Sequence, residues 1–147
     1  MEQMKISNKG IALIREFEGC RLQSYRCSAG VWTIGYGHTG KDIKEGMTIT
    51  QQEADDWLMV DCNRVLQMLR DTLRVPIRQN QLDALVSLGF NIGTEALRKS
   101  TLMSLVNRNP DDLNIPEQFD RWVYASGKVV NGLVRRRKAE GRLYASR

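Results

Sequence analysis

A carboxylate near the beginning of the chain stands where acid catalysis is possible. Apolar residues recur at helical spacing before it, at Ile11, Ile14 and Phe17. Gly19 favours a helix end, so Glu18 is expected in the last turn. The free carbonyl groups of a last turn carry partial negative charge, which disfavours an ionised carboxylate. A carboxyl group that keeps its proton near neutral pH can serve as a general acid.

A glycine-rich segment follows and could fold back over this helix end. Residues 31–38 read VWTIGYGH, and glycines stand at 30, 35 and 37. The alternation of aromatic and small residues with turn glycines predicts a two- or three-stranded β-ribbon over residues 21–38. Such a ribbon would face Glu18. Taken alone, Glu18 would be an ordinary solvated residue, and it is the spacing of the residues after it that favours an active site.

The polar residues of this region follow one another at a characteristic spacing. Glu18 is followed by Cys27, Thr33 and the turn Gly-Tyr-Gly-His at 35–38. This order resembles the catalytic pattern of the phage-type lysozymes, the endolysins of glycoside hydrolase family 24, in which a Glu, an Asp (in some members a Cys) and a Thr precede a Gly-x-Gly-His turn. The resemblance continues in the same order along nearly the whole chain, through NQLDALVSLGFNIG at 80–93, STL at 100–102, RWVY at 121–124 and GLVRRRKAE at 132–140.

The resemblance implies a part in glycosidic bond cleavage for each of the three residues. Glu18 would protonate the leaving oxygen, Cys27 would take the place of the second catalytic group, and Thr33 would help to hold the attacking water. The cysteine departs from the common pattern, because an ordinary thiol, with a pKa of about 8.5, is mostly neutral at pH 7. A lowered pKa would make Cys27 a base or a nucleophile, and otherwise it is an inert cysteine in a degraded site. The neighbouring Arg26 is a poor source of such a shift, because adjacent strand residues point to opposite faces.

The resemblance also implies supporting residues around the catalytic groups. His38 would pair with Asp61 on a long helix and so tie the ribbon to that helix. Asn91 would contact the glycan, and a second role as a helix C-cap is compatible with that. Trp122 would support the site by packing in the core.

A run of arginines near the C-terminus would complete the site. By the resemblance, one arginine approaches Glu18, and Arg136 is our candidate, although the sequence does not decide among Arg135, Arg136 and Arg137. Such a pairing would favour the ionised form of Glu18 and oppose the effect of the helix end. The plainer interpretation of this run is the solvated face of a C-terminal helix.

Several helices are needed to position these residues. Ser7 suits the N-cap of a helix over 7–18, and Thr50 with Glu53 forms a capping box that starts a helix running to about residue 71. The apolar contacts of this long helix are expected from Trp57, Val60, Val65, Leu66 and Leu69. Further helices are expected over 78–90, 94–107 and 116–124, and a last helix carries the arginines after a turn bracketed by Gly127 and Gly132.

The fold is therefore predicted to be α+β and predominantly α-helical. By the resemblance it is a lysozyme-like, two-lobed fold, a single domain of residues 1–147. Residues 1–49 would form a small lobe with the N-terminal helix and the β-ribbon, 50–72 a connecting helix, and 73–147 a helical lobe. A chain of this length can bury a core of its own.

The charge balance narrows the possible partners. The chain has 22 basic and 17 acidic residues, and its formal net charge of +5 attracts polyanions such as the bacterial envelope or nucleic acid. No reading motif or set of stacking aromatic residues accompanies the basic run, so no nucleic-acid partner is expected. The apolar stretches near the N-terminus are too short for membrane insertion or for a signal peptide, which predicts a soluble cytoplasmic product on synthesis. The protein is also expected to be a monomer. By the resemblance it would reach the cell wall in the periplasm after release by a holin.

The cysteines do not indicate a metal site. They stand at 20, 27 and 62, without a spacing typical of metal ligands, and only one histidine accompanies them. Neither a metal nor another cofactor is therefore expected. A pairing of Cys20 with Cys27 in an oxidising periplasm, which would switch the enzyme off, stays open.

The resemblance implies an endolysin, a muramidase that hydrolyses the β-1,4 bond between N-acetylmuramic acid and N-acetylglucosamine in peptidoglycan. Its natural role would be host-cell lysis by a phage or prophage. Two alternatives stay open. With Glu18 as the only acid and base, the protein would be a lytic transglycosylase. If Cys27 does not function, it would be a catalytically impaired peptidoglycan-binding relic.

Overall fold

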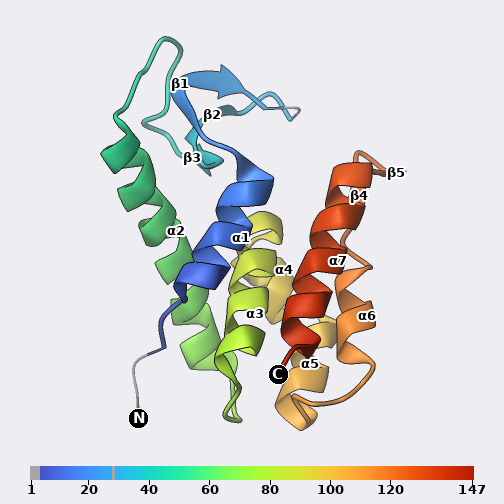
Figure 1. Ribbon diagram of the computed structural model, residues 1–147. Coiled ribbons are helices and arrows are strands. Elements are labelled where there is room, and N and C mark those ends of the chain that lie inside the picture. The colour runs from blue at the N-terminus through green and yellow to red at the C-terminus, as the bar shows by residue number, and fades with distance from the viewer. Residues whose placement is uncertain (1–3, 28) are drawn as a thin grey trace.

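A small antiparallel sheet lies at one end of a long helix, and the remaining helices gather along that helix and beyond it (Figure 1). The computed structural model describes residues 4–27 and 29–147. The mostly helical fold with one small three-stranded sheet confirms the predicted fold class. The division of the chain at residues 49 and 72 remains a prediction.

Helix α1 (Asn8–Glu18) carries the candidate acid at its last position. Ser7 caps its N-terminus as predicted, and Gly19 ends it with a φ of 64° while its N–H donates to the carbonyl of Arg15. The backbone N–H of Ser7 donates at 2.9 Å to Asp83 on helix α3 (Gln79–Ile92), and the Ser7 hydroxyl donates to the same carboxylate. The start of α1 is thereby fixed on α3.

The sheet is formed by β1 (Arg21–Arg26), β2 (Trp32–Gly35) and β3 (His38–Thr39) in the order β1-β2-β3. Arg26 pairs with Trp32 and Ile34 pairs with His38, all strands being antiparallel. Gly35 and Gly37 have φ values of 66° and 75°, which only glycine adopts without strain. These glycines therefore allow the chain to turn from β2 into β3, as the ribbon prediction required.

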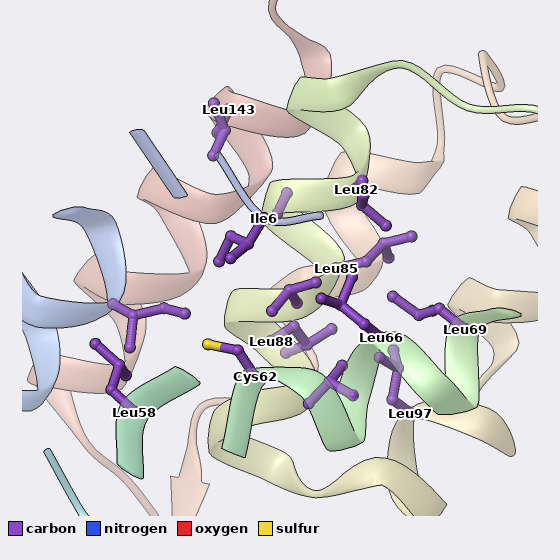
Figure 2. Close-up of a cluster of buried hydrophobic side chains, with 14 of the residues drawn as sticks. Ile6, Leu58, Cys62, Leu66, Leu69, Leu82, Leu85, Leu88, Leu97 and Leu143 are labelled. Atoms are coloured by element: carbon purple, nitrogen blue, oxygen red, sulfur yellow. The ribbon is translucent and has the colours of Figure 1, made fainter. Parts of the chain in front are cut away.

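Helix α2 (Gln51–Thr72) begins with the predicted capping box. The Thr50 hydroxyl accepts from the N–H of Glu53 at 3.1 Å, and the Glu53 carboxylate accepts from the N–H of Thr50 at 3.2 Å. Its buried face carries Ala54, Leu58, Cys62, Val65, Leu66 and Leu69 (Figure 2). Trp57 packs partly buried against this core, but Val60 is 47% exposed, so the inward contact expected of Val60 is wrong.

Helix α3 (Gln79–Ile92) is the centre of the helical part. All residues from 81 to 89 are buried. The helix contacts α1, α2, α4 (Thr94–Arg98) and α7 (Asn131–Ala145). Leu82, Leu85 and Leu88 face the residues of α2 in the same apolar cluster (Figure 2). A Cβ at Gly89 would lie 2.7 Å from a Val65 methyl group and 2.9 Å from one of Leu97, so the glycine allows these helices to approach closely.

The C-terminal half differs from the prediction in three places. The expected helix over 94–107 is two helices, α4 (Thr94–Arg98) and α5 (Thr101–Arg108), because Ser100 caps α5 by accepting from the N–H of Met103. The expected helix over 116–124 is only α6 (Ile115–Phe119). The last helix, α7 (Asn131–Ala145), includes Gly132, which was expected in a turn.

The chain between α6 and α7 forms a small hairpin. Strands β4 (Tyr124–Ala125) and β5 (Lys128–Val129) flank Ser126 and Gly127, whose φ values are 51° and 77°. Two successive residues with positive φ are the signature of the tight turn that joins adjacent antiparallel strands. Trp122 and Tyr124 therefore lie outside a helix, contrary to the prediction. Among the described residues, no helix has the length and apolarity to cross a bilayer.

Candidate active site

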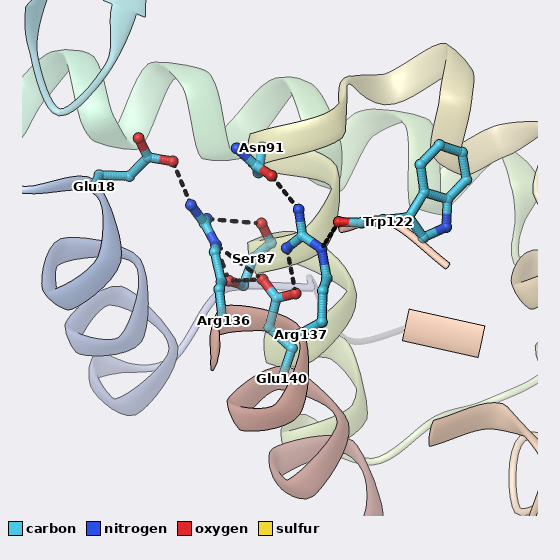
Figure 3. Close-up of polar contacts among 7 residues, drawn as sticks. All are labelled: Glu18, Ser87, Asn91, Trp122, Arg136, Arg137 and Glu140. Atoms are coloured by element: carbon cyan, nitrogen blue, oxygen red, sulfur yellow. Dashed lines mark hydrogen bonds and ion pairs between the residues drawn. The ribbon is translucent and has the colours of Figure 1, made fainter. Parts of the chain in front are cut away.

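Glu18 lies at the junction of α1, the sheet and α7. Its side chain is 16% exposed, and its Oε2 is 2.6 Å from Nη1 of Arg136 (Figure 3). Its other oxygen, Oε1, faces Gly37, where a Cβ would lie only 2.7 Å away. The backbone of the glycine turn therefore packs against the carboxylate. Of the three candidate arginines, Arg136 is the one that pairs with Glu18.

A buried polar network behind Glu18 holds Arg136 in place. Its Nε is 3.2 Å from Oε2 of Glu140, and its Nη2 donates to the carbonyl of Ser87 at 3.1 Å. The Ser87 hydroxyl donates to the same oxygen of Glu140. Glu140 is fully buried and Arg136 is 3% exposed, so this end of α7 is fixed against α3 by charged groups that water does not reach.

Arg137 makes the second half of this network (Figure 3). Its Nη1 donates to Oε1 of Glu140 at 2.6 Å, its Nε donates to the carbonyl of Trp122 at 2.8 Å, and its Nη2 donates to Oδ1 of Asn91. Burial lowers the pKa of Arg137, and the adjacent Glu140 carboxylate opposes that shift. Glu140 thus binds both arginines.

Asn91, predicted to contact the glycan, and Trp122, predicted to support the site by packing in the core, both lie beside this network. Asn91 is exposed in the last turn of α3, while Gly93 is the C-cap, so the expected C-cap role of Asn91 is wrong. Trp122 is partly buried and packs against the core. Next to them is a pocket of about 540 Å³, lined by Asn91, Ile92, Arg121, Trp122, Tyr124, Ala125, Leu133 and Arg137.

Cys27 stands directly after β1, where the chain reverses toward β2. Its N–H donates to the carbonyl of Val31 at 3.0 Å. Hydrogen bonds from the backbone of Val31, and then of Ala29, hold the pKa of the Cys27 thiol below its ordinary value. Arg26 does not contribute, since its guanidinium lies over the ring of Trp32 at 5.0 Å. Backbone amides thus supply the shift.

Thr33 lies on β2, directly after the turn that leads from Cys27 to this strand. It is 3% exposed, and its hydroxyl donates to the carbonyl of Val31 at 2.9 Å. With its proton engaged in this way, the hydroxyl oxygen can still accept a hydrogen bond. On β1, burial raises the pKa of Tyr25, and the negative charges of Glu18 and Cys27 raise it further. The Arg21 guanidinium, 4.6 Å above the Tyr25 ring, opposes this shift.

His38 connects the sheet to α2. Its Nδ1 is 2.8 Å from Oδ2 of Asp61, and its ring lies against that of Trp57 with centroids 4.6 Å apart. The structure thus brings together the predicted pair. No group of three potential metal ligands occurs within residues 4–27 and 29–147.

Sequence reasoning did not identify several residues of this site. Ser87 and Glu140 are polar residues on the buried faces of helices, a pattern that signals a satisfied polar network. Tyr25 sits in the predicted ribbon between two candidate catalytic residues. Gly37 was noted only as part of a turn, and its contact with the carboxylate depends on packing that a linear pattern does not contain.

The chain is similar to known proteins along nearly its whole length. The family model described as phage lysozyme matches residues 15–140. The endolysin of Acyrthosiphon pisum secondary endosymbiont phage 1 is 43% identical and is matched over 97% of this chain and 99% of its own. The muramidase domain of SpmX from Asticaccaulis excentricus is 37% identical with a TM-score of 0.87, covering 97% of this chain and 99% of that one. The endolysin from Escherichia coli O157:H7 phage FAHEc1 is 36% identical with a TM-score of 0.87, covering 97% and 94%. The chain therefore belongs to the phage lysozyme family.

Proposed function

We propose that this protein is a peptidoglycan muramidase in which Glu18, Cys27 and Thr33 perform the hydrolysis. It cleaves the β-1,4 bond between N-acetylmuramic acid and N-acetylglucosamine and serves host-cell lysis as an endolysin. Membership of the phage lysozyme family supports the reaction class. The observation that carries the assignment of residues is the carboxylate of Glu18, held by Arg136 at 2.6 Å on one oxygen and facing the glycine turn with the other.

The proton that leaves Glu18 is assigned to Oε1. Since Oε2 is bound by Arg136, Oε1 is the oxygen left to carry a proton to the glycosidic oxygen. As the bond to the leaving sugar breaks, this proton completes the new hydroxyl group, and Arg136 stabilises the carboxylate that remains. Gly37 carries no side chain that would block Oε1.

Cys27 is assigned the role of base and Thr33 that of water ligand. The lowered pKa of Cys27 favours the thiolate, which accepts a proton from the attacking water. The Thr33 oxygen accepts a hydrogen bond from the same water, because the Thr33 proton is directed to the carbonyl of Val31. The water oxygen then bonds to the anomeric carbon. A later exchange of the proton from Cys27 to Glu18 through solvent restores the resting site.

A turbidity assay on outer-membrane-permeabilised Gram-negative cells tests this proposal. Wild type should clear the suspension and release reducing ends, whereas Glu18→Gln and Cys27→Ala should each lose activity by at least ~100-fold. Lysis that needs Glu18 but survives Cys27→Ala would remove Cys27 from the mechanism. Products lighter by one water would indicate transglycosylation instead of hydrolysis.

Alkylation of the thiols provides an independent check. Burial raises the pKa of Cys62 to about 12, so this thiol should resist iodoacetamide. Cys27 is partly exposed with a lowered pKa and should react first, with loss of lysis. Cys20→Ala is the matched control, because Cys20 is also partly exposed and should not be needed. Unchanged activity after complete labelling of Cys27 would contradict its role.

We also propose that the protein acts as a monomer and reaches the wall only after a holin opens the inner membrane. Expression of the protein alone should leave Gram-negative cells intact until the membrane is permeabilised from outside. Lysis without permeabilisation would contradict the need for a holin. Sedimentation of the pure protein should give a single species of 16.8 kDa.

A further inference from the structure

Arg137 is buried and has fixed partners on three sides. It is 1% exposed, and it donates to Glu140 at 2.6 Å, to the carbonyl of Trp122 at 2.8 Å and to Oδ1 of Asn91. A guanidinium group has five N–H donors in a rigid plane and no acceptor. Once Glu140 and the Trp122 carbonyl hold this plane, the position of the donor that meets Asn91 is determined.

The orientation of the Asn91 amide follows from this. The two ends of an asparagine amide differ chemically, since the oxygen only accepts and the nitrogen only donates. Arg137 can only donate, so the amide oxygen must face it, and the reverse orientation would place two donors against each other. Figure 3 shows the result: Oδ1 points to Arg137, and Nδ2 points away from it, toward the side on which Glu18 lies.

We propose that Arg137 is a positioning residue that makes Asn91 a fixed hydrogen-bond donor to the substrate. This inference rests on the proposed function, and it adds which end of the amide meets the glycan. Asn91 is exposed, and its Nδ2 points away from Arg137 toward the side of Glu18 (Figure 3). The group recognised by such a donor is an uncharged acceptor oxygen, such as the carbonyl of an acetamido group or a hydroxyl oxygen of the sugar. An amide nitrogen is an uncharged donor, so this contact does not require an anionic group on the glycan.

Two substitutions of Asn91 distinguish this role from a merely structural one. Asn91→Asp keeps the shape and the acceptor for Arg137 but turns an acceptor toward the glycan. Asn91→Ala removes both contacts. If Asn91 only served as a partner of Arg137, the aspartate would be the better substitute, because a carboxylate binds a guanidinium more strongly than an amide does. If Asn91 donates to the substrate, the aspartate should be the worse one.

The experiment measures binding to purified sacculi in a Glu18→Gln background, where the polymer is not consumed. We expect Asn91→Ala to weaken binding about fivefold and Asn91→Asp roughly 30-fold, as for loss of one hydrogen bond and for a facing, unsatisfied carboxylate. The thermal midpoint of Asn91→Asp should equal or exceed that of the parent. Equal binding by parent and Asn91→Asp, with Asn91→Ala weaker than both, would overturn the proposal.

A substitution of Arg137 tests whether substrate binding by Asn91 depends on its contact with Arg137. Arg137→Lys keeps the charge but cannot reach all three acceptors at once. Combined with Asn91→Ala, it should weaken binding no further than Asn91→Ala alone, whereas full additivity would count against the coupling. If Arg137→Lys does not fold, the Asn91 variants still decide the donor role through binding, and the thermal midpoint of Asn91→Asp reports its contact with Arg137. Because binding is the measured quantity, the result is independent of whether the proposed hydrolysis is observed.

Discussion

At the scale of single residues, the site combines groups whose chemistry is set by the backbone around them. The thiol of Cys27 is the clearest case, because amides of the turn after β1, and no neighbouring cation, lower its pKa. A thiolate formed in this way remains present at a lower pH than that of an ordinary cysteine. Activity that needs the thiolate must therefore fall as the pH is lowered through this pKa.

Replacing Cys27 should change the pH at which activity is lost on the acid side of the pH profile, its acid limb. Cys27→Asp, whose carboxyl group ionises at a pKa of about 3.9 in model peptides, should keep lysis and extend it to lower pH. Cys27→Ser, whose hydroxyl stays neutral over the whole range, should lose at least ~100-fold at every pH. Initial rates of turbidity loss between pH 4 and 9 provide the measurement. An unchanged acid limb in Cys27→Asp would show that another group controls it.

Gly37 allows a second prediction at this scale. Gly37→Ala introduces a Cβ that would lie 2.7 Å from Oε1 of Glu18, at a φ of 75°. We expect a loss of ~1–2 kcal/mol in the free energy of unfolding from the positive φ, together with loss of lysis from displacement of the carboxylate. Urea denaturation and the turbidity assay measure the two effects separately.

Gly46 offers a matched control for Gly37. Its φ is 76°, but a Cβ there would have no atom within 4 Å. Gly46→Ala should therefore lose a similar amount of stability and keep its activity. If Gly37→Ala were as active as Gly46→Ala, the contact between the glycine turn and Glu18 would have no part in the mechanism.

At the scale of elements, local signals in the sequence predicted helices better than they predicted contacts. The caps Ser7, Gly19 and Thr50 were recognisable because each satisfies the helix end through groups only a few residues away. The hairpin after α6 was missed, since strands of two residues produce no periodic pattern, and only the pair Ser126 and Gly127 signalled its turn.

The candidate site shows the same limit. The positions of Glu18 and Cys27 followed from spacing, but the choice of Arg136 over its neighbours depends on the rotation of α7 against α3. A slip of one residue on a helix turns a side chain by about 100°, which is more than a sequence alignment resolves in an arginine run. The link from Arg137 to Asn91 likewise joins residues far apart in the chain.

The packing of α7 against α3 allows a prediction about stability. Glu140 is fully buried and accepts hydrogen bonds from Ser87, Arg136 and Arg137. Glu140→Gln preserves the shape but leaves two buried guanidinium groups with one carboxylate fewer, and removal of one partner from a buried ion pair costs about 3–5 kcal/mol. Urea denaturation should show a loss of this size, and Glu117→Gln, on the exposed surface of α6, should change little. A loss below ~1 kcal/mol would mean that Glu140 is dispensable for the network.

At the scale of the whole molecule, two properties act together on a polymeric substrate. The sheet, α1 and α7 meet at Glu18, so the catalytic groups come from parts of the chain that must all remain in place. The net charge of +5 belongs to the whole surface and acts at longer range. Such a field raises the local concentration at an anionic wall without determining which bond is cleaved.

The net charge should therefore make the rate depend on salt when the substrate is the anionic polymer. The rate on a small neutral substrate should depend little on salt. Salt screens charges beyond about 10 Å at 0.1 M and beyond about 3 Å at 1 M. Raising the salt concentration from 0.05 to 0.5 M should slow the clearing of cells several-fold, because association with the anionic wall weakens. The second substrate is a short oligosaccharide of alternating N-acetylmuramic acid and N-acetylglucosamine whose carboxyl groups are amidated, so that it is neutral and still carries the bond to be cleaved. Its hydrolysis, followed by release of reducing ends, should change by less than about twofold, because the buried ion pairs around Glu18 are screened far less than exposed charges. Equal inhibition of both substrates would instead place the sensitivity to salt in the site itself, at the pair of Glu18 and Arg136.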